Sequence, residues 1–86
     1  MKLSFSSRFT KQLLNYCKKN EQLRQKFSKQ IKLFENNPVH PSLKLHKLKG
    51  KRSTQFAIWI APNIRALCAK REDEYVFSEI VTHDEY

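Results

Sequence analysis

The sequence of 86 residues has one glycine, three prolines and two cysteines, and it has no hydrophobic run long enough to cross a bilayer. Its longest apolar stretch is Phe56–Pro62. Low glycine and proline, with 40% hydrophobic and 12% aromatic residues, argue against a disordered chain. A chain this short forms a single domain, residues 1–86, with one thin core. We therefore expect an open surface site rather than an enclosed pocket.

The two cysteines do not form a motif. Cys17 and Cys68 lie far apart, and neither belongs to a CxxC or Cys/His spacing that binds zinc. We therefore expect no metal site and interpret both as small apolar residues in a reducing compartment. Met1–Phe5 is too short for the apolar region of a signal peptide. We expect a cytoplasmic protein without a membrane partner.

Acidic residues are scarce through most of the chain. Residues 1–71 contain all 17 Lys and Arg but only Glu21 and Glu35 among the acids, whereas residues 72–86 contain the other acids and no Lys or Arg. The formal net charge is +9. Such a charge attracts polyanions and speeds encounter with them. It does not distinguish RNA from DNA, an acidic membrane or an acidic protein.

The first half of the chain predicts a strand and a helical hairpin. Met1–Phe5 alternates polar and apolar residues, and Ser6 and Ser7 are N-cap candidates for a helix. A break at Asn20-Glu21 separates this helix from a second one that runs to about Glu35. The apolar residues at helical spacing are Phe9, Leu13 and Tyr16 in the first helix and Leu23, Phe27, Ile31 and Phe34 in the second. Basic residues occupy the other face of the second helix, namely Arg24, Lys26, Lys29 and Lys32.

The second half changes to the alternation of strands. The predicted strands are Leu43–Leu48, Phe56–Ala61, Ile64–Lys70 and Tyr75–Thr82, with turns at Pro62-Asn63 and Arg71–Glu74. Short turns imply antiparallel pairing. We predict a two-layer α+β fold, in which the N-terminal helical hairpin packs on one face of an antiparallel sheet of three to five strands. The opposite face would be functional, and we interpret Trp59 as a core residue.

Several segments together resemble the RelE/ParE toxin superfamily. Phe34-Glu-Asn-Asn-Pro38, His40-Pro41-Ser42-Leu43 and Leu45-His46-Lys47-Leu48-Lys49-Gly50 are similar to the family's passage from helical hairpin to sheet. Arg65 stands on a strand where the family usually has an Arg, and Thr82-His83-Asp84-Glu85-Tyr86 is similar to the end of its YafQ-like branch. The sequence departs from that branch at Val81, where a Gly is usual, and in the spacing of His83 and Tyr86. It also has Ala57, Trp59 and Asn63 where that branch has His and Asp.

The resemblance implies a RelE-like fold and the toxin of a type II toxin–antitoxin pair, with no metal or cofactor. Such a toxin would enter the ribosomal A site and cut the messenger RNA there. It would be a monomer when free and a hetero-oligomer with its cognate antitoxin. The alternative is a non-enzymatic inhibitor of DNA gyrase, like the ParE branch. A third possibility is a basic RNA-binding module that cleaves nothing.

Cleavage of RNA through the 2′-hydroxyl needs a base, an acid and cations for the charged phosphorane. Histidine suits both proton transfers. His83 follows a strand beside two carboxylates, which favour its protonated form, and the lysines around His46 favour the neutral form. Either histidine can take either role. Without a catalytic role, His83 would be an ordinary exposed residue and His46 a polar residue of the solvent face, while His40 is interpreted as structural.

Two more residues complete the predicted catalytic set. Arg65 would bind the scissile phosphate, because a guanidinium is always charged and binds phosphate oxygens in a fixed fork. The structural alternative is an ion pair with Glu79 or Asp84. Tyr86 would stack on a nucleobase, unless it belongs to a frayed end of the chain.

Basic residues also cluster within a short segment, namely Lys44, Lys47, Lys49, Lys51 and Arg52. A charge cluster can be merely solvated surface, but few acids balance this one. We therefore predict that it binds RNA phosphates. The basic set on the second helix, Arg24, Lys26, Lys29 and Lys32, would bind ribosomal RNA by the same attraction.

Overall fold

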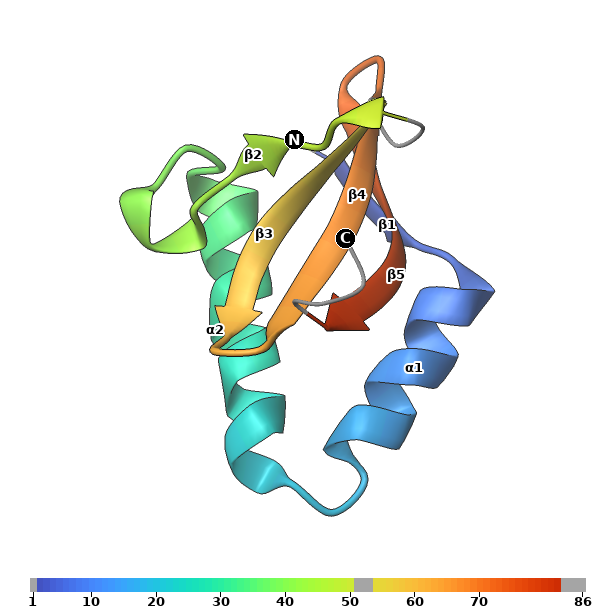
Figure 1. Cartoon of the computed structure of the whole chain (residues 1–86), viewed down its shortest axis with the longest axis vertical. Coiled ribbons are helices and arrows are strands. Elements are labelled where there is room, and N and C mark those ends of the chain that lie inside the picture. The colour runs from blue at the N-terminus through green and yellow to red at the C-terminus, as the bar shows by residue number, and fades with distance from the viewer. Residues whose placement is uncertain (1, 51–53, 83–86) are drawn as a thin grey trace.

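A helical hairpin and a sheet make up the part of the chain that the computed structural model describes, residues 2–50 and 54–82 (Figure 1). The elements in order are β1 (Lys2–Phe5), α1 (Ser7–Cys17), α2 (Glu21–Asn36), the 3-10 helix η1 (Pro41–Leu43), β2 (His46–Lys47), β3 (Gln55–Ala61), β4 (Ile64–Arg71) and β5 (Glu74–Thr82). The predicted α+β class is confirmed.

Each helix begins at a side-chain cap. Ser6 Oγ accepts a hydrogen bond from Phe9 N at 3.0 Å, and Asn20 Oδ1 accepts one from Leu23 N at 3.0 Å. These bonds satisfy N–H groups that the first helical turn leaves without partners. The break predicted at Asn20-Glu21 is therefore the start of α2.

The sheet has the strand order β1-β5-β4-β3-β2. Strands β2 to β5 pair antiparallel, as predicted from their turns. The prediction is wrong for β1, which pairs with β5 in parallel from Lys2↔Glu74 to Phe5↔Phe77. No turn joins these two strands, so turn length does not set their direction, and the hairpin carries the chain away from β1 across one face.

The predicted strand Leu43–Leu48 is also too long. Leu43 belongs to η1, which has Pro41 in its first turn, where the fixed backbone angle of proline favours helical conformation. Lys44 then takes a left-handed conformation, with φ of 48° and ψ of 42°, which no strand residue adopts. Only His46 and Lys47 remain to form β2.

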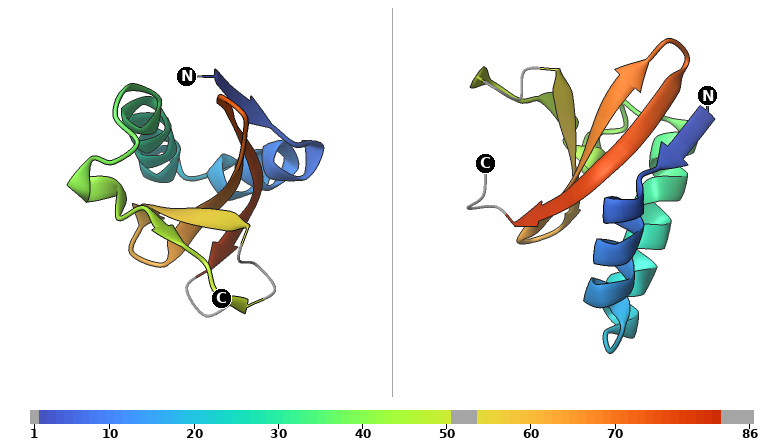
Figure 2. Two further views of the ribbon diagram at one scale, coloured as in Figure 1. Left: turned by 90° about the horizontal axis from the view of Figure 1, so that it is seen from above. Right: turned by 90° about the vertical axis from the view of Figure 1, so that its right-hand side faces the viewer.

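Both helices lie on one side of the sheet (Figure 2, right). Their buried side chains meet those of the strands in one cluster, and within it the ring of Phe34 packs edge-on against Tyr75 at 4.9 Å and Phe77 at 5.4 Å between centroids. A small second cluster lies on the other face of the sheet, formed by Leu48, Ala57, Leu67 and Val81. Burial on both faces agrees with the apolar sequence of β3.

Two glutamines join the helices to the sheet. Gln30 of α2 is 4% exposed, and its Nε2 donates to Trp59 O at 2.9 Å and to Ser42 O at 3.3 Å. Gln12 of α1 lies at the edge of β5 beyond the last β1 pair. Its Nε2 donates to Ile80 O at 3.1 Å, and its Oε1 accepts from Ile80 N at 2.7 Å. The Gln12 amide thus makes the two hydrogen bonds that a neighbouring strand would make.

No helix in the described ranges is both long and apolar enough to cross a membrane.

Replacing Gln12 by Ala should lower the free energy of unfolding by about 1–3 kcal/mol, because the Ile80 backbone, on a residue only 1% exposed, loses both partners. Gln25→Ala makes the same chemical change at an exposed position of α2 and should cost less than about 0.5 kcal/mol. Urea unfolding followed by circular dichroism measures both. Equal stability of the two variants would show that Gln12 does not support the edge of β5.

Candidate functional site

The face of the sheet opposite the helices carries the polar residues that the sequence singled out. The strand register forms two rows across this face, one of His46, Ala57, Leu67 and Glu79 and one of Trp59, Arg65 and Val81. Residues paired in this way share a face. We call this surface the open face, defined by His46, Trp59, Arg65 and Glu79 around the cluster of Leu48, Ala57, Leu67 and Val81.

The ring of His46 is held by the backbone of Lys44, two residues earlier in the chain. Its Nδ1 lies 3.0 Å from the backbone oxygen of Lys44. A carbonyl oxygen can only accept, so the ring donates from Nδ1, and in the neutral ring Nε2 then keeps the lone pair. This tautomer suits a base that accepts a proton at Nε2.

Arg65 is held beside the turn between β3 and β4. Its Nη1 donates to Ala61 O at 2.9 Å and to Ile64 O at 3.1 Å. These bonds use one nitrogen of the guanidinium, which has further N–H donors for a phosphate. The structural alternative was an ion pair with Glu79 or Asp84. Glu79 Oε2 lies 3.5 Å from Arg8 Nη2, and Asp84 lies outside the described residues. Within the described residues no carboxylate forms an ion pair with Arg65.

The interpretation of Trp59 as a core residue is wrong. Its side chain is only partly buried and belongs to neither hydrophobic cluster. Lys44 Nζ lies 5.8 Å and Arg65 Cζ 5.9 Å from the centre of its ring. The alternation of β3 already indicated the position of Trp59. Phe56, Ile58 and Ile60 form the strongly apolar face of this strand, and Trp59 shares the other face with Gln55 and Ala57.

The structure divides the predicted phosphate-binding cluster. Lys44 reaches the open face, whereas Lys47 pairs with Phe56 and so projects from the other face of β2. Lys49 is exposed in the loop after β2. Lys51 and Arg52 lie outside the described residues, as do His83 and Tyr86 of the predicted catalytic set.

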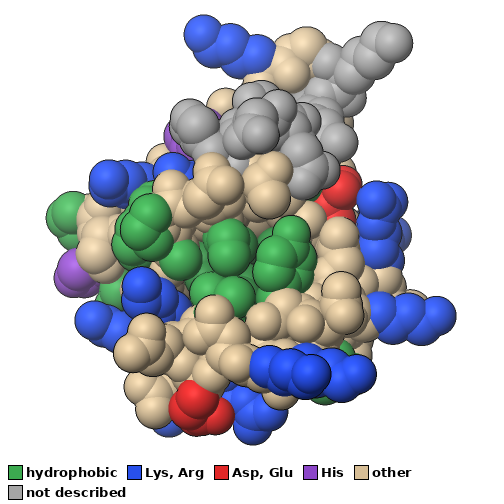
Figure 3. Space-filling model, turned by 60° about the horizontal axis from the view of Figure 1, so that its bottom comes forward, with side chains coloured by type: hydrophobic (Ala, Val, Ile, Leu, Met, Phe, Trp, Pro, Cys, Tyr) green, Lys and Arg blue, Asp and Glu red, His purple; other side chains and the backbone are tan. Residues whose placement is uncertain are grey.

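The basic residues of α2 belong to the helical layer. Lys26, Lys29 and Lys32 are exposed, and Arg24 Nε lies 3.8 Å from Glu21 Oε1. They are therefore separate from the open face. At the lower end of the molecule, Lys and Arg side chains surround a central hydrophobic area (Figure 3). Positive charge is thus spread over both layers.

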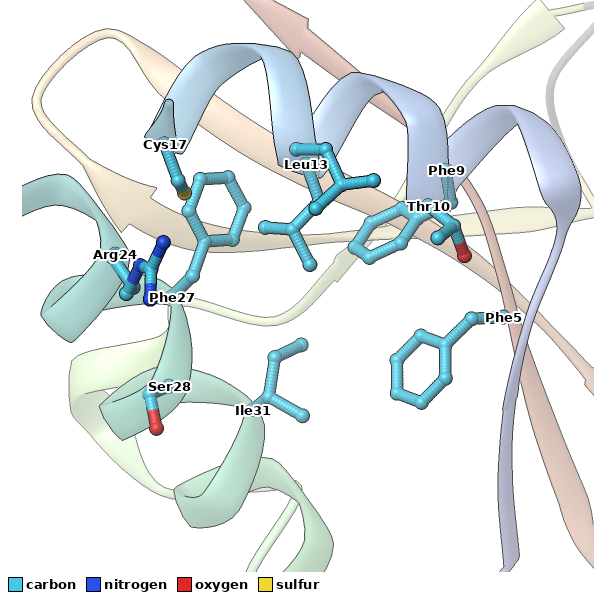
Figure 4. Close-up of a pocket in the computed structure, with 10 residues that line it drawn as sticks. Phe5, Phe9, Thr10, Leu13, Cys17, Arg24, Phe27, Ser28 and Ile31 are labelled. Carbon is cyan, nitrogen blue, oxygen red and sulfur yellow. The ribbon is translucent and has the colours of Figure 1, made fainter. Parts of the chain in front are cut away.

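An apolar groove of about 470 Å³ lies between α1 and α2. Side chains from both helices point toward one another across it, with Phe5 of β1 at one end (Figure 4). Its lining includes Phe9, Leu13, Phe27 and Ile31, and no histidine or carboxylate of the described residues belongs to it. The groove therefore lacks the groups for proton transfer that the open face has.

Cys17 and Cys68 are buried free thiols, which agrees with their interpretation as small apolar residues. Burial raises the pKa of Cys68 from 9.0 to about 12. Burial also raises the pKa of Cys17, against the opposing effect of Arg24. Since the thiolate is the reactive form, neither residue suits a nucleophile. Among the described residues there is no group of three or more His, Cys, Asp or Glu that could hold a metal ion.

Comparison with known proteins gives no matching family model and no matching curated protein. Solved structures do match. YafQ from E. coli strain BL21(DE3) has a TM-score of 0.77 and 18% identity over 95% of this chain and 92% of its own. A YoeB/ParE toxin from Agrobacterium tumefaciens has a TM-score of 0.78 and 15% identity over 96% of this chain and 99% of its own. YafQ in the E. coli DinJ–YafQ toxin–antitoxin complex has a TM-score of 0.75 and 18% identity over 95% of this chain and 91% of its own. The RelE-like fold that the resemblance implied is confirmed.

The cysteines give a prediction about pH. At pH 8, alkylation of Cys68 by iodoacetamide should be at least about 100-fold slower in the native protein than in urea, because the raised pKa leaves far less thiolate. The folded state binds the thiol proton more tightly, so this contribution to stability is complete below pH 9 and is lost as the pH rises toward 12. Mass spectrometry of the alkylated peptides measures the rates. Equal rates in native and unfolded protein would contradict the burial of Cys68.

Proposed function

We propose that this protein is a toxin of the RelE/ParE superfamily, from a type II toxin–antitoxin pair, and that it cleaves messenger RNA in the ribosomal A site without a metal ion. One observation carries the proposal. The strand register brings His46 and Arg65 to the same open, basic face of a fold that YafQ and a YoeB/ParE toxin share. Base and phosphate-binding groups on one face are what cleavage through the 2′-hydroxyl requires.

His46 is the base in this proposal. Its Nε2 removes the proton from the 2′-hydroxyl, and the resulting oxygen attacks the adjacent phosphorus. The hydrogen bond from Nδ1 to Lys44 O keeps the accepting nitrogen in place and stabilises the imidazolium that forms. The phosphorane then breaks its bond to the 5′-oxygen, which leaves with a proton from the acid. The products are a 2′,3′-cyclic phosphate and a 5′-hydroxyl.

Arg65 stabilises the phosphorane. Charge grows on the non-bridging oxygens as the new bond forms, and a guanidinium fixed in position needs no reorganisation to bind them. The two bonds to Ala61 O and Ile64 O supply that fixation. Because no described carboxylate forms an ion pair with Arg65, its charge is available to the phosphate.

His83 is the acid, and Tyr86 holds a base of the RNA. Both assignments rest on the sequence. One feature of the described residues, the register at the end of β5, supports the assignment of His83. Thr82 pairs with Ile64, next to the pair of Arg65 with Val81, and His83 follows Thr82 directly in the chain. An acid is needed beside the phosphate that Arg65 binds.

Basic residues outside the catalytic set bind the rest of the RNA. Lys44 and Lys49, together with Lys51 and Arg52, bind the phosphates of the messenger RNA. Lys47, which projects from the other face of β2, binds them only where the RNA strand passes around that edge of the sheet. On the helical layer, Arg24, Lys26, Lys29 and Lys32 bind ribosomal RNA. Three of these four α2 residues form no ion pair with a described carboxylate, and their long-range attraction is strongest at low salt.

A protein antitoxin is the second partner. YafQ, which has the same fold as this chain, forms a toxin–antitoxin complex with DinJ. We infer that a cognate antitoxin covers the basic surface of this chain with acidic and apolar residues. The free toxin is then a monomer that acts in the cytoplasm, where ribosomes are. Co-purification with the product of an adjacent gene tests this partner.

The proposed activity predicts new ends within the A-site codon when the protein is added to ribosomes paused on a defined messenger RNA. Arg65→Ala should slow cleavage about 10²–10³-fold, because a phosphate-binding donor is lost. His46→Gln and His83→Ala should each slow it about 10²–10⁴-fold. Arg71→Ala, an exposed position at the end of the same strand as Arg65, should leave the rate unchanged. Primer extension maps and quantifies the ends.

Free messenger RNA without ribosomes is the control and should stay intact. Intact messenger RNA on ribosomes with the wild-type protein would overturn the nuclease. Inhibition of DNA supercoiling by gyrase would then support the ParE-like alternative. Salt-dependent RNA binding without cleavage would instead indicate a binding module.

A further inference from the structure

Trp59 is the single tryptophan of the chain, and it belongs to neither of the hydrophobic clusters formed by the described residues. It lies in the same row of the sheet as Arg65, with which it is paired directly. An indole left partly in water is not explained by core packing, because tryptophans bury large areas when they stabilise a core. Its position beside the proposed phosphate-binding residue indicates a ligand.

Two cations lie over the ring, but neither is stacked closely on it. Lys44 Nζ and Arg65 Cζ lie 5.8 and 5.9 Å from the ring centre, close to the outer limit of about 6 Å for a cation–π contact. A guanidinium stacked flat on the ring would be much nearer. The arrangement therefore places two phosphate-binding groups close to an aromatic surface.

A residue of the helical layer holds the backbone under this arrangement. Gln30, buried under the sheet, donates to the backbone oxygens of both Trp59 and Ser42. This ties β3 to the segment that carries Lys44. Lys44 itself has a φ of 48°, a conformation that costs energy in a residue with a side chain. The loop is thus held in a particular shape beside the indole.

We propose that Trp59 is a stacking platform for an RNA base next to the cleaved phosphate, with Lys44 and Arg65 binding the phosphates on its two sides. This inference rests on the proposed function and names the part of the substrate that the open face recognises. A base has a π face that stacks on an indole whatever its identity, so the platform binds single-stranded RNA without selecting its sequence. Arg65 then positions the nucleotide and stabilises the phosphorane at the same site.

The single tryptophan makes the test direct, because all indole fluorescence comes from Trp59. A short single-stranded RNA, titrated at low salt, should quench this fluorescence. An abasic ribose–phosphate strand of the same length has the same charges, so it should bind with little quenching. Equal quenching by the two strands would show that phosphate binding alone perturbs Trp59, and would overturn the proposal.

Variants test how much Trp59 contributes to the affinity for RNA. Trp59→Leu should weaken binding of the base-containing RNA about 10-fold or more and leave binding of the abasic strand unchanged, whereas Trp59→Phe should keep most of the affinity. Phe5→Leu removes an aromatic ring that is 46% exposed outside the open face, and it should change neither affinity. Fluorescence anisotropy of labelled strands measures binding, and circular dichroism checks that each variant folds. Unchanged RNA affinity in folded Trp59→Leu would overturn the platform.

The titration contains no ribosome and needs no cleavage, so its failure is separate from failure of the nuclease. If messenger RNA on ribosomes stays intact while base-dependent quenching is observed, the nuclease is excluded and the platform is supported. If cleavage occurs and the two strands quench equally, the nuclease is supported and the platform is excluded.

Discussion

The amide of Gln30 is the interaction on which the arrangement of the open face depends. A buried amide is costly unless its polar atoms find partners, and this one is 4% exposed. Its partners are the backbone oxygens of Trp59 and Ser42, so one side chain connects α2, β3 and the segment of η1. The segment joined in this way carries Lys44, which lies over Trp59 and whose backbone oxygen bonds the ring of His46. The helical layer thereby determines geometry on the far side of the sheet.

The distribution of side-chain size explains why one face is open. On β3 the large residues Phe56, Ile58 and Ile60 face the helices, and burying them requires the hairpin. The other face has only a small hydrophobic cluster, which includes Ala57 and Leu67. Burying this cluster needs no second layer of helices. On that face the acidic residue Glu79 has a cationic partner, whereas the cation Arg65 has no acidic partner among the described residues. Glu79 pairs with Arg8, which reaches it from α1, while Arg65 bonds only to neutral backbone oxygens among the described residues.

The sequence predicts what depends on local signals. Caps and apolar spacing gave both helices, and alternation with short turns gave β3, β4 and β5. The parallel pairing of β1 with β5 was missed, because it joins the two ends of the chain and no local pattern encodes it. The length of β2 was missed because the left-handed conformation of Lys44, a residue that rarely adopts it, has no sequence signature. For the site, the resemblance pointed to Arg65, and the alternating segment around β2 contained His46. Trp59 was missed, because its hydrophobicity was interpreted as burial. The roles of His83, Tyr86, Lys51 and Arg52 stay predictions.

The thinness of the domain bears on the proposed dependence on the ribosome. A sheet with helices on one face can offer a surface but not a closed pocket, and no wall stands opposite His46 and Arg65 among the described residues. Efficient proton transfer nevertheless needs the reacting groups within hydrogen-bond distance and correctly aligned. On an open face, that alignment has to come from contacts on either side of the reacting phosphate, or from a partner that presents the RNA in one conformation. A stacking surface at Trp59 would fix one nucleotide, and the ribosome would fix the strand. Neither an enclosed site nor a large core is then required of a chain of 86 residues.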